Sequence, residues 1–224
     1  MSDLQKSFNE RAPIYDKWVH GICPHYEEAL DALSNALVPS ASFVLELGCG
    51  TGILSLRMLR KYPKAQLTVV DISPAMLEVS RGKLKEYKDR INFIEKDFNS
   101  FDSKYRFDII VSSLAVHHLD RKNKERLFET AFSMLEPRGC FYLFDCVQGA
   151  SRDIENLNHK VWMEYMRSQG VPENEIGYAL ERQKNHDIRD TLFLQFELFK
   201  KIGFVDIDVI WKYYGIAVFG ARKY

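Results

Sequence analysis

Three glycines stand at alternate positions, Gly48, Gly50 and Gly52, directly after an apolar run over residues 43–47. A glycine turn between a buried strand and a helix lets a ligand approach the main chain closely, because no Cβ stands in the way. Glu46 lies two residues before the first glycine, where it would repel a pyrophosphate but could attract the ammonium group of an amino acid. The spacing therefore favours a ligand that carries an amino-acid moiety over a dinucleotide.

Two further carboxylates stand where the next predicted strands end. Asp71 closes a strand over residues 66–71, at the spacing of about 20 residues from the glycines at which an acidic group meets a ribose diol. Asp97 follows the third predicted strand and can accept a hydrogen bond from an adenine amino group, beside the backbone N–H of Phe98. Asp71 might instead only cap a turn, but the glycines upstream favour ribose binding.

These segments resemble the class I S-adenosylmethionine (SAM)-dependent methyltransferases. Glu46 and the glycines match their motif I, E/D-x-G-x-G-x-G, and residues 107–119 (F-D-x-x-x-S-x-x-x-x-H-H-L) and 135–139 (L-x-P-x-G) match in order and spacing. The resemblance implies an α/β fold with a Rossmann-like, doubly wound, seven-stranded sheet, mostly parallel with an antiparallel C-terminal hairpin strand, plus a helical lid. It implies an enzyme with SAM as cofactor and S-adenosyl-L-homocysteine (SAH) as product. The expected cofactor-binding residues are Tyr26, Glu46, Gly48, Cys49, Gly50, Gly52, Asp71, Ile72, Met76, Asp97, Phe98 and Ser113.

The chain reads as a single methyltransferase domain over residues 1–224. Its expected parts are an N-terminal helical cover (1–40), a SAM-binding core (41–149), a helical lid insertion (150–190), and a C-terminal helix with a β-hairpin (191–224). The residues expected to cover the substrate are Tyr15, Trp18, Trp162, Tyr165 and Arg182. The alternative for the N-terminal aromatic residues is that they only seal the edge of the domain.

His117 and His118 are the candidate general bases, because an acceptor that is not already deprotonated needs one and histidine titrates near neutral pH. Each might instead serve only packing or helix capping. The loop at residues 112–115 is Ser-Ser-Leu-Ala and lacks the N/D-P-P-Y/F/W motif of enzymes that methylate base amino groups or glutamine amides. The 31 basic and 31 acidic residues give zero net charge, which argues against DNA as a partner. A small-molecule methyl acceptor is therefore expected.

Residues 24–26 and 150–222 also resemble bacterial carboxy-SAM synthase. Pro24-His25-Tyr26 matches a P-x-Y segment whose tyrosine contacts the ligand. Two departures oppose that activity: the synthase has serine at the position of Gly50, and its carboxylate-binding arginine falls on Leu180, with Arg182 only nearby. Ordinary SAM is the preferred cofactor, with a carboxy-SAM synthase-like enzyme or a non-catalytic SAM-binding regulatory protein as alternatives.

The remaining composition predicts a cytoplasmic protein. The N-terminus is too polar for a signal peptide, and no apolar run approaches the length of a membrane span. Cys23, Cys49, Cys140 and Cys146 show no metal-binding spacing, so reduced thiols and no metal are expected. A homodimer is a possible assembly.

Overall fold

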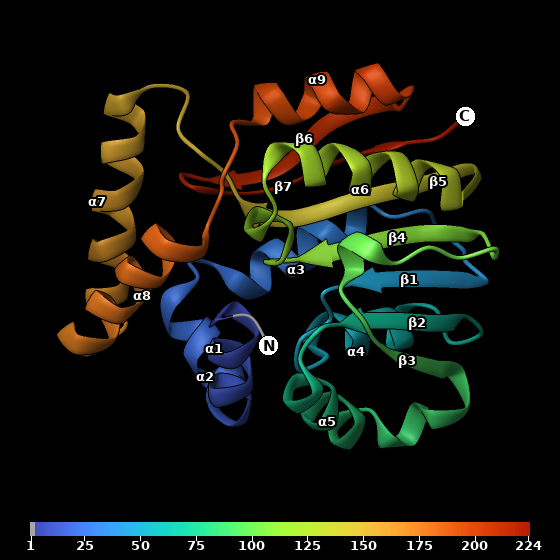
Figure 1. The fold of residues 1–224 in the computed structure, drawn as a ribbon, viewed down its shortest axis with the longest axis horizontal. Helices are drawn as coiled ribbons and strands as arrows, with labels where there is room; N and C mark the ends of the chain where they lie inside the picture. The colour runs from blue at the N-terminus through green and yellow to red at the C-terminus, as the bar shows by residue number, and fades with distance from the viewer. Residues whose placement is uncertain (1–2) are drawn as a thin grey trace.

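The computed structural model describes residues 3–224, which form a seven-stranded sheet in the order β3-β2-β1-β4-β5-β7-β6 (Figure 1). The strands are β1 (Phe43–Leu47), β2 (Gln66–Asp71), β3 (Ile91–Glu95), β4 (Phe107–Ser113), β5 (Leu135–Cys146), β6 (Val205–Tyr213) and β7 (Ile216–Arg222). The first five strands pair in parallel, and β7 runs antiparallel to both β5 and β6. This confirms the predicted Rossmann-like fold with its antiparallel C-terminal hairpin.

Helices cover both faces of the sheet, because successive strand residues alternate between two apolar clusters. Val44 packs in the cluster that contains residues of α3 (Tyr26–Ala36), α4 (Ile53–Lys61) and α5 (Pro74–Lys83). Its neighbour Leu45 packs in the other cluster, with α6 (Arg121–Met134) and α9 (Leu192–Ile202). Each face of the parallel sheet is therefore buried, as the continuous apolar runs of its strands require.

Four helices gather beyond one end of the sheet, at the left of Figure 1. They are α1 (Asp3–Arg11), α2 (Tyr15–Ile22), α7 (Arg152–Ser168) and α8 (Glu173–His186). Trp162 of α7 donates its indole N–H to the Ile22 carbonyl at 2.6 Å, and Arg11 of α1 pairs with Glu175 of α8 at 2.8 Å. These contacts join α1 and α2 to α7 and α8, and the four helices are called here the cap.

Several element boundaries differ from the sequence expectation. The proline and glycine of the L-x-P-x-G segment at residues 135–139 predict a turn before the fifth strand, but β5 already begins at Leu135, which pairs with Phe107. The ladder then shifts register and resumes where Cys140 pairs with Ile109, so the segment is a bulge within the strand. From the sequence, Gly170-Val171-Pro172 predicts the start of a second lid helix that runs through Leu180, but the helix, α8, begins at Glu173 and continues to His186. The hairpin turn is Tyr214-Gly215, because β6 continues through Tyr213.

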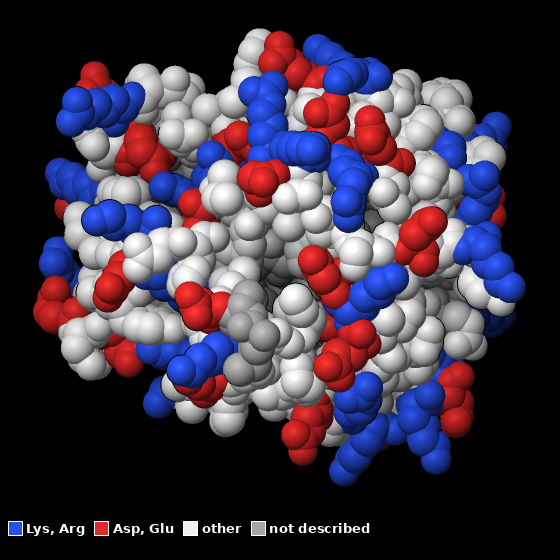
Figure 2. All heavy atoms as spheres, viewed as in Figure 1, with Lys and Arg blue, Asp and Glu red and all other residues white. Residues whose placement is uncertain are grey.

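The surface carries both signs of charge. Figure 2 shows lysine and arginine interspersed with aspartate and glutamate over the viewed face, in keeping with the zero net charge. Among residues 3–224, no helix combines the length and apolar character that a membrane crossing requires.

Candidate functional site

A first cavity, called here the glycine-loop cavity, lies at the carboxyl ends of β1, β2 and β4. Its empty volume is about 1040 Å³ including the open mouth, enough for a nucleoside with an amino-acid arm. The predicted cofactor residues that line it are Tyr26, Glu46, Gly48, Cys49, Gly50, Asp71, Ile72, Met76, Asp97, Phe98 and Ser113. Gly52 is not part of the lining: its φ of +83° serves the turn, and a Cβ there would lie 2.5 Å from Ser80 Oγ.

Asp71 fixes the position of the glycine loop through hydrogen bonds to the main chain. Its Oδ2 accepts the Gly50 N–H at 2.7 Å and its Oδ1 accepts the Ser73 N–H at 2.8 Å. Gly50 has a φ of +52°, and no atom lies within 4 Å of where its Cβ would stand, so its main chain is open to the cavity. Burial raises the pKa of Asp71, and the bonds from the backbone N–H groups oppose that rise. The arrangement suits a ribose beside a bare main chain.

Glu46 lies beneath the glycine loop, and only 1% of it is exposed. Ser55 donates its hydroxyl to Glu46 Oε2 at 2.5 Å, yet burial raises the pKa of Glu46 to about 8. A cation in the cavity would favour the ionised form. Glu46 therefore fits the ammonium group for which the sequence singled it out.

The N-terminal cover is bonded to the rim of this cavity. Gln5 of α1 donates to the Ile72 carbonyl at 2.7 Å, and Ser73 donates its hydroxyl to Asn9 at 2.7 Å. On α2, Asp16 accepts from Thr51 of the glycine loop at 2.5 Å. The cover thus reaches the same loop and strand end that shape the cavity.

A second cavity, called here the lid pocket, lies beneath the cap and has an empty volume of about 860 Å³. Tyr15 and Leu114 line both cavities, so the two adjoin. Of the predicted substrate-covering residues, Tyr15, Trp18, Trp162 and Arg182 line the lid pocket. Tyr165 is not among the lining residues, and its hydroxyl donates to the His20 carbonyl at 3.4 Å.

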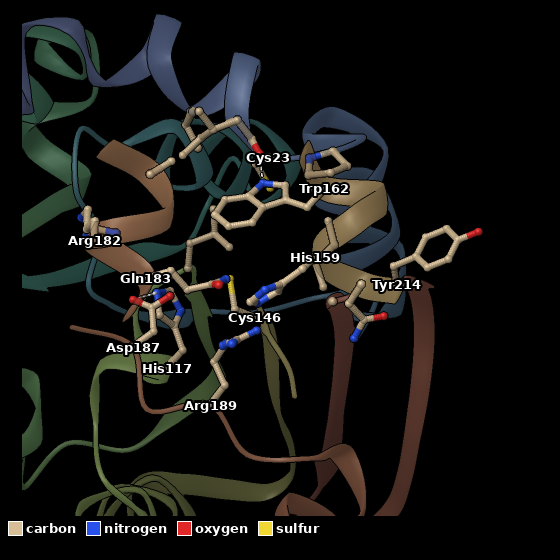
Figure 3. Close-up of a pocket in the computed structure, with 18 of the residues that line it drawn as sticks. Cys23, His117, Cys146, His159, Trp162, Arg182, Gln183, Asp187, Arg189 and Tyr214 are labelled. Atoms are coloured by element: carbon tan, nitrogen blue, oxygen red, sulfur yellow. Dashed lines mark hydrogen bonds and ion pairs between the residues drawn. The ribbon is translucent and has the colours of Figure 1, made fainter. Parts of the chain in front are cut away.

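His117 lines the lid pocket, where Figure 3 shows it beside Asp187. It is 4% exposed, its Nδ1–H donates to Asp145, and its Nε2 lies 3.7 Å from Asp187 Oδ1. Burial lowers the pKa of His117, but the charges of the two carboxylates outweigh burial and leave that pKa raised. The residue is thus a buried imidazole whose proton affinity two carboxylates increase.

His118 lines the glycine-loop cavity, although it is adjacent in sequence. Its Nδ1–H donates to the His186 carbonyl at 3.1 Å and lies 3.4 Å from Asp187, while Arg182 Nη2 lies 3.5 Å from its Nε2. Burial, then the neighbouring His117 and Arg182, lower the pKa of His118 well below its usual value. It is therefore a neutral link between the lid and the β4 loop.

The cluster of His117, His118 and Asp187 has metal-ligand atoms within 4.8 Å of one another. However, Nδ1 of His118 already faces a carbonyl oxygen and its Nε2 faces the guanidinium of Arg182. Metal ligation through Nδ1 would put the remaining ring N–H against that guanidinium. The donor set fits a hydrogen-bonded network better than a cation.

Sequence reasoning missed several side chains at these cavities. Asp145 ends the apolar run 140–145, a signal of the kind that identified Asp71, and it could have been found. Asp187 and Arg189 follow the lid helix α8, where nothing in the local pattern indicates that they return to the β4 loop. The backbone makes that return explicit, since the Ile188 N–H donates to the His117 carbonyl at 2.7 Å.

Comparison with known proteins agrees with this geometry. A family model described as a methyltransferase domain matches residues 44–139. Carboxy-S-adenosyl-L-methionine synthase of Nautilia profundicola is 25% identical over 227 residues, covering 98% of this chain and 96% of the relative. Malonyl-[acyl-carrier protein] O-methyltransferase 1 of Ilyobacter polytropus is 29% identical over 136 residues, covering 61% of this chain and 49% of the relative.

Among solved structures, the DhpI-SAH complex matches with a TM-score of 0.67 at 17% identity, covering 98% of this chain and 94% of that one. The chain spans 55% of the length of the S-adenosylmethionine-dependent methyltransferase SibL and of the pyocyanin biosynthetic protein PhzM, which match with TM-scores of 0.62 and 0.64. The domain match over residues 44–139 and the fold together support a class I SAM-dependent methyltransferase.

Proposed function

We propose that the protein transfers a methyl group from SAM, bound in the glycine-loop cavity, to a small molecule bound in the lid pocket. The observation that carries the proposal is the junction of the two cavities at Tyr15 and Leu114. The residues suited to a nucleoside line one side of this junction, and the buried His117–Asp145 pair stands on the other.

The glycine-loop cavity offers partners for the ribose, the adenine base and the ammonium group of the cofactor. Asp71 would hold the ribose hydroxyls, Asp97 and the Phe98 N–H the adenine edge, and Glu46 the ammonium group. Ile72 and Met76 would pack on the base. The chemistry supplied by bound SAM is an activated methyl group on a sulfonium.

The chain's own task in the lid pocket is to orient the acceptor, exclude water and accept a proton. Holding reactants in line can supply about 7–11 kcal/mol of a barrier. His117 is placed to accept this proton. Asp145 accepts a hydrogen bond from the Nδ1–H of His117, so Nε2 is the ring nitrogen that faces the lid pocket. Figure 3 shows Asp187 beside His117.

A carboxy-SAM synthase-like activity is the second candidate. The observation in its favour is Arg182, which lines the lid pocket and has no carboxylate within ion-pair distance among residues 3–224. Against it stand glycine at position 50 and leucine at position 180, as described from the sequence. A SAM-binding regulatory protein without turnover is the third candidate.

We also propose a cytoplasmic location, since all four cysteines are free thiols. A homodimer stays a prediction.

The test begins with native mass spectrometry of the purified protein and identification of any nucleoside that it releases. SAM or SAH supports the proposal, and the carboxylated sulfonium supports the second candidate. Calorimetric titration with SAM follows, and then a screen for SAH formation with small acceptors. Binding without turnover across oxygen, nitrogen and sulfur acceptors would favour the regulatory protein, and absence of SAM binding would refute all three.

A further inference from the structure

Arg182, which lines the lid pocket, forms no ion pair with a carboxylate of residues 3–224. Arg182 of α8 stacks its guanidinium 4.7 Å from the ring of Phe8 and approaches His118 Nε2 at 3.5 Å. No carboxylate of residues 3–224 lies within ion-pair distance of it, whereas Arg189 in the same pocket pairs with Glu155 at 2.8 Å. A part-buried guanidinium presents several N–H donors in one plane, and two of them can bind the paired oxygens of a carboxylate.

A second hydrogen-bond donor, the indole of Trp18, lies on the same wall. The indole Nε1–H of Trp18 is buried and has no hydrogen-bond partner within the described part of the chain. Its ring lies 5.9 Å from the Arg182 guanidinium, and both residues line the lid pocket. A buried N–H group without a hydrogen-bond acceptor destabilises the protein, so the wall formed by Arg182 and Trp18 is suited to receive an oxyanion.

The His117 side of the lid pocket carries negative charge, whereas the wall of Arg182 and Trp18 carries hydrogen-bond donors. Asp187 lies 3.7 Å from His117 Nε2, with 5% of its side chain exposed, and Asp145 lies on the other ring nitrogen. Two buried carboxylates disfavour a further anion at this point. A carboxylate that was itself methylated would need no base, which would leave the buried His117–Asp145 pair without a role.

We propose that the methyl acceptor is a small carboxylic acid with a separate hydroxyl or amino group. Its carboxylate binds Arg182 and the Trp18 indole N–H, and its hydroxyl or amine faces His117. The aromatic walls at Trp162, Tyr213 and Tyr214 suit an aromatic or otherwise apolar body. This inference rests on the proposed methyl transfer and adds the class of acceptor to it.

Methyl transfer to such an acceptor needs no reactant other than SAM, the acceptor and the base. The acceptor oxygen or nitrogen forms a bond to the methyl carbon as the methyl–sulfur bond breaks, and that electron pair remains on sulfur. The proton of the hydroxyl or amine passes to Nε2 of His117. The carboxylate stays unchanged at Arg182 and fixes the distance of the nucleophile from the base.

The probes are two matched pairs, benzoate with benzamide and 4-hydroxybenzoate with 4-hydroxybenzamide. Each is titrated into the full-length protein at saturating SAH, and binding is followed by tryptophan fluorescence, since Trp18 and Trp162 line the pocket. We expect each acid to bind at least tenfold more tightly than its amide. Arg182→Gln should abolish the difference, and Arg189→Gln, the matched control whose guanidinium is already paired, should retain it.

Equal affinities for acid and amide, absence of acid binding, or a preference that survives Arg182→Gln would overturn the inference. Calorimetry with SAH on the same three proteins separates the failures. If SAH binds and the acid preference is absent, only the acceptor class is wrong; if SAH does not bind, the proposed function fails as well. A co-purified carboxylated sulfonium would assign the carboxylate at Arg182 to the cofactor and refute the acceptor assignment.

Discussion

His117 donates its Nδ1–H to Asp145, and this bond follows from the pairing of two parallel strands. Ser113, at the end of β4, pairs with Phe144 of β5, so the residue after Phe144 lies beside the turn that carries His117. The bond leaves Nε2 as the free ring nitrogen on the lid-pocket side. Sheet register therefore sets the tautomer of the proposed base.

Replacing His117 by alanine should slow methyl transfer about 10²–10⁴-fold, the usual contribution of a general base. The affinity for SAM should change less than threefold, because His117 does not line the glycine-loop cavity. Single-turnover kinetics and calorimetry measure the two quantities. His159→Ala is the matched control, since that histidine lines the same pocket but pairs with Glu155. An unchanged rate in His117→Ala, or a large loss of SAM affinity, would contradict the assignment.

Replacing Asp187 by asparagine should move the pH dependence of turnover to lower pH. The base must be neutral, and its raised pKa means that the wild-type rate rises with pH through that pKa. Loss of the Asp187 charge lowers the pKa of His117, and the rise should shift by about 1 pH unit. Single-turnover rates between pH 5.5 and 9 test this. A profile that does not move would show that Asp187 has no electrostatic effect on the base.

The cofactor side of the site was predictable because its signals are local. The glycine spacing, Glu46 and the strand-terminal Asp71 each lie in a short segment, and parallel strands bring their carboxyl ends to one edge. Ser73 at the start of α5 illustrates the same point, since its hydroxyl accepts the Met76 N–H at 3.1 Å as its position before Pro74 predicts. Gly52 lies outside the cavity lining with a positive φ, and the motif alone does not distinguish a turn glycine from a lining one.

The acceptor side depends on contacts between distant segments, and the sequence contains no local signal for them. His117 and His118 are indistinguishable as neighbours, and only the short 3₁₀ turn at Val116–His118 directs them to different cavities. Asp187 reaches His117 because the segment after α8 is anchored by Lys124, which is 1% exposed and donates to the Ile188 carbonyl. The sequence of α6 gives no sign that Lys124 is buried and binds the segment after α8.

Replacing Asp71 by asparagine should weaken SAM binding about 10–150-fold, equivalent to the 1.5–3 kcal/mol of a charged hydrogen bond. The asparagine keeps the size and one acceptor oxygen for the two backbone N–H groups that Asp71 holds. Calorimetry measures the affinity. Asp108→Asn is the matched control: Asp108 also accepts two backbone N–H groups, from Ser42 and Phe43, but is not part of the cavity lining. Equal losses in both variants would attribute the effect to folding.

Replacing Glu46 by glutamine should abolish a proton release that accompanies SAM binding. The pKa of Glu46 is raised to about 8 by burial, so at pH 7 the carboxyl is mostly protonated before binding. An ammonium group beside it favours the carboxylate, and the proton leaves to solvent. Calorimetry at pH 7 in two buffers of different ionisation enthalpy measures this release. Wild-type protein should release up to about one proton per SAM. Equal release by the Glu46→Gln variant would exclude Glu46 as its source.

The raised pKa of Glu46 also predicts how the stability of the ligand-free protein depends on pH. The ordinary pKa of Glu46 is 4.5 and its folded-state pKa is about 8, so between these values the folded chain binds more protons at Glu46 than the unfolded chain does. The contribution of Glu46 to the free energy of unfolding must therefore fall as pH rises from about 5 to 8. Glu46→Gln removes that fall, and its advantage over wild type should grow across this range. Urea unfolding at pH 5, 6.5 and 8 tests it: a difference between the two proteins that stays constant with pH would mean that Glu46 is ionised in the folded state throughout.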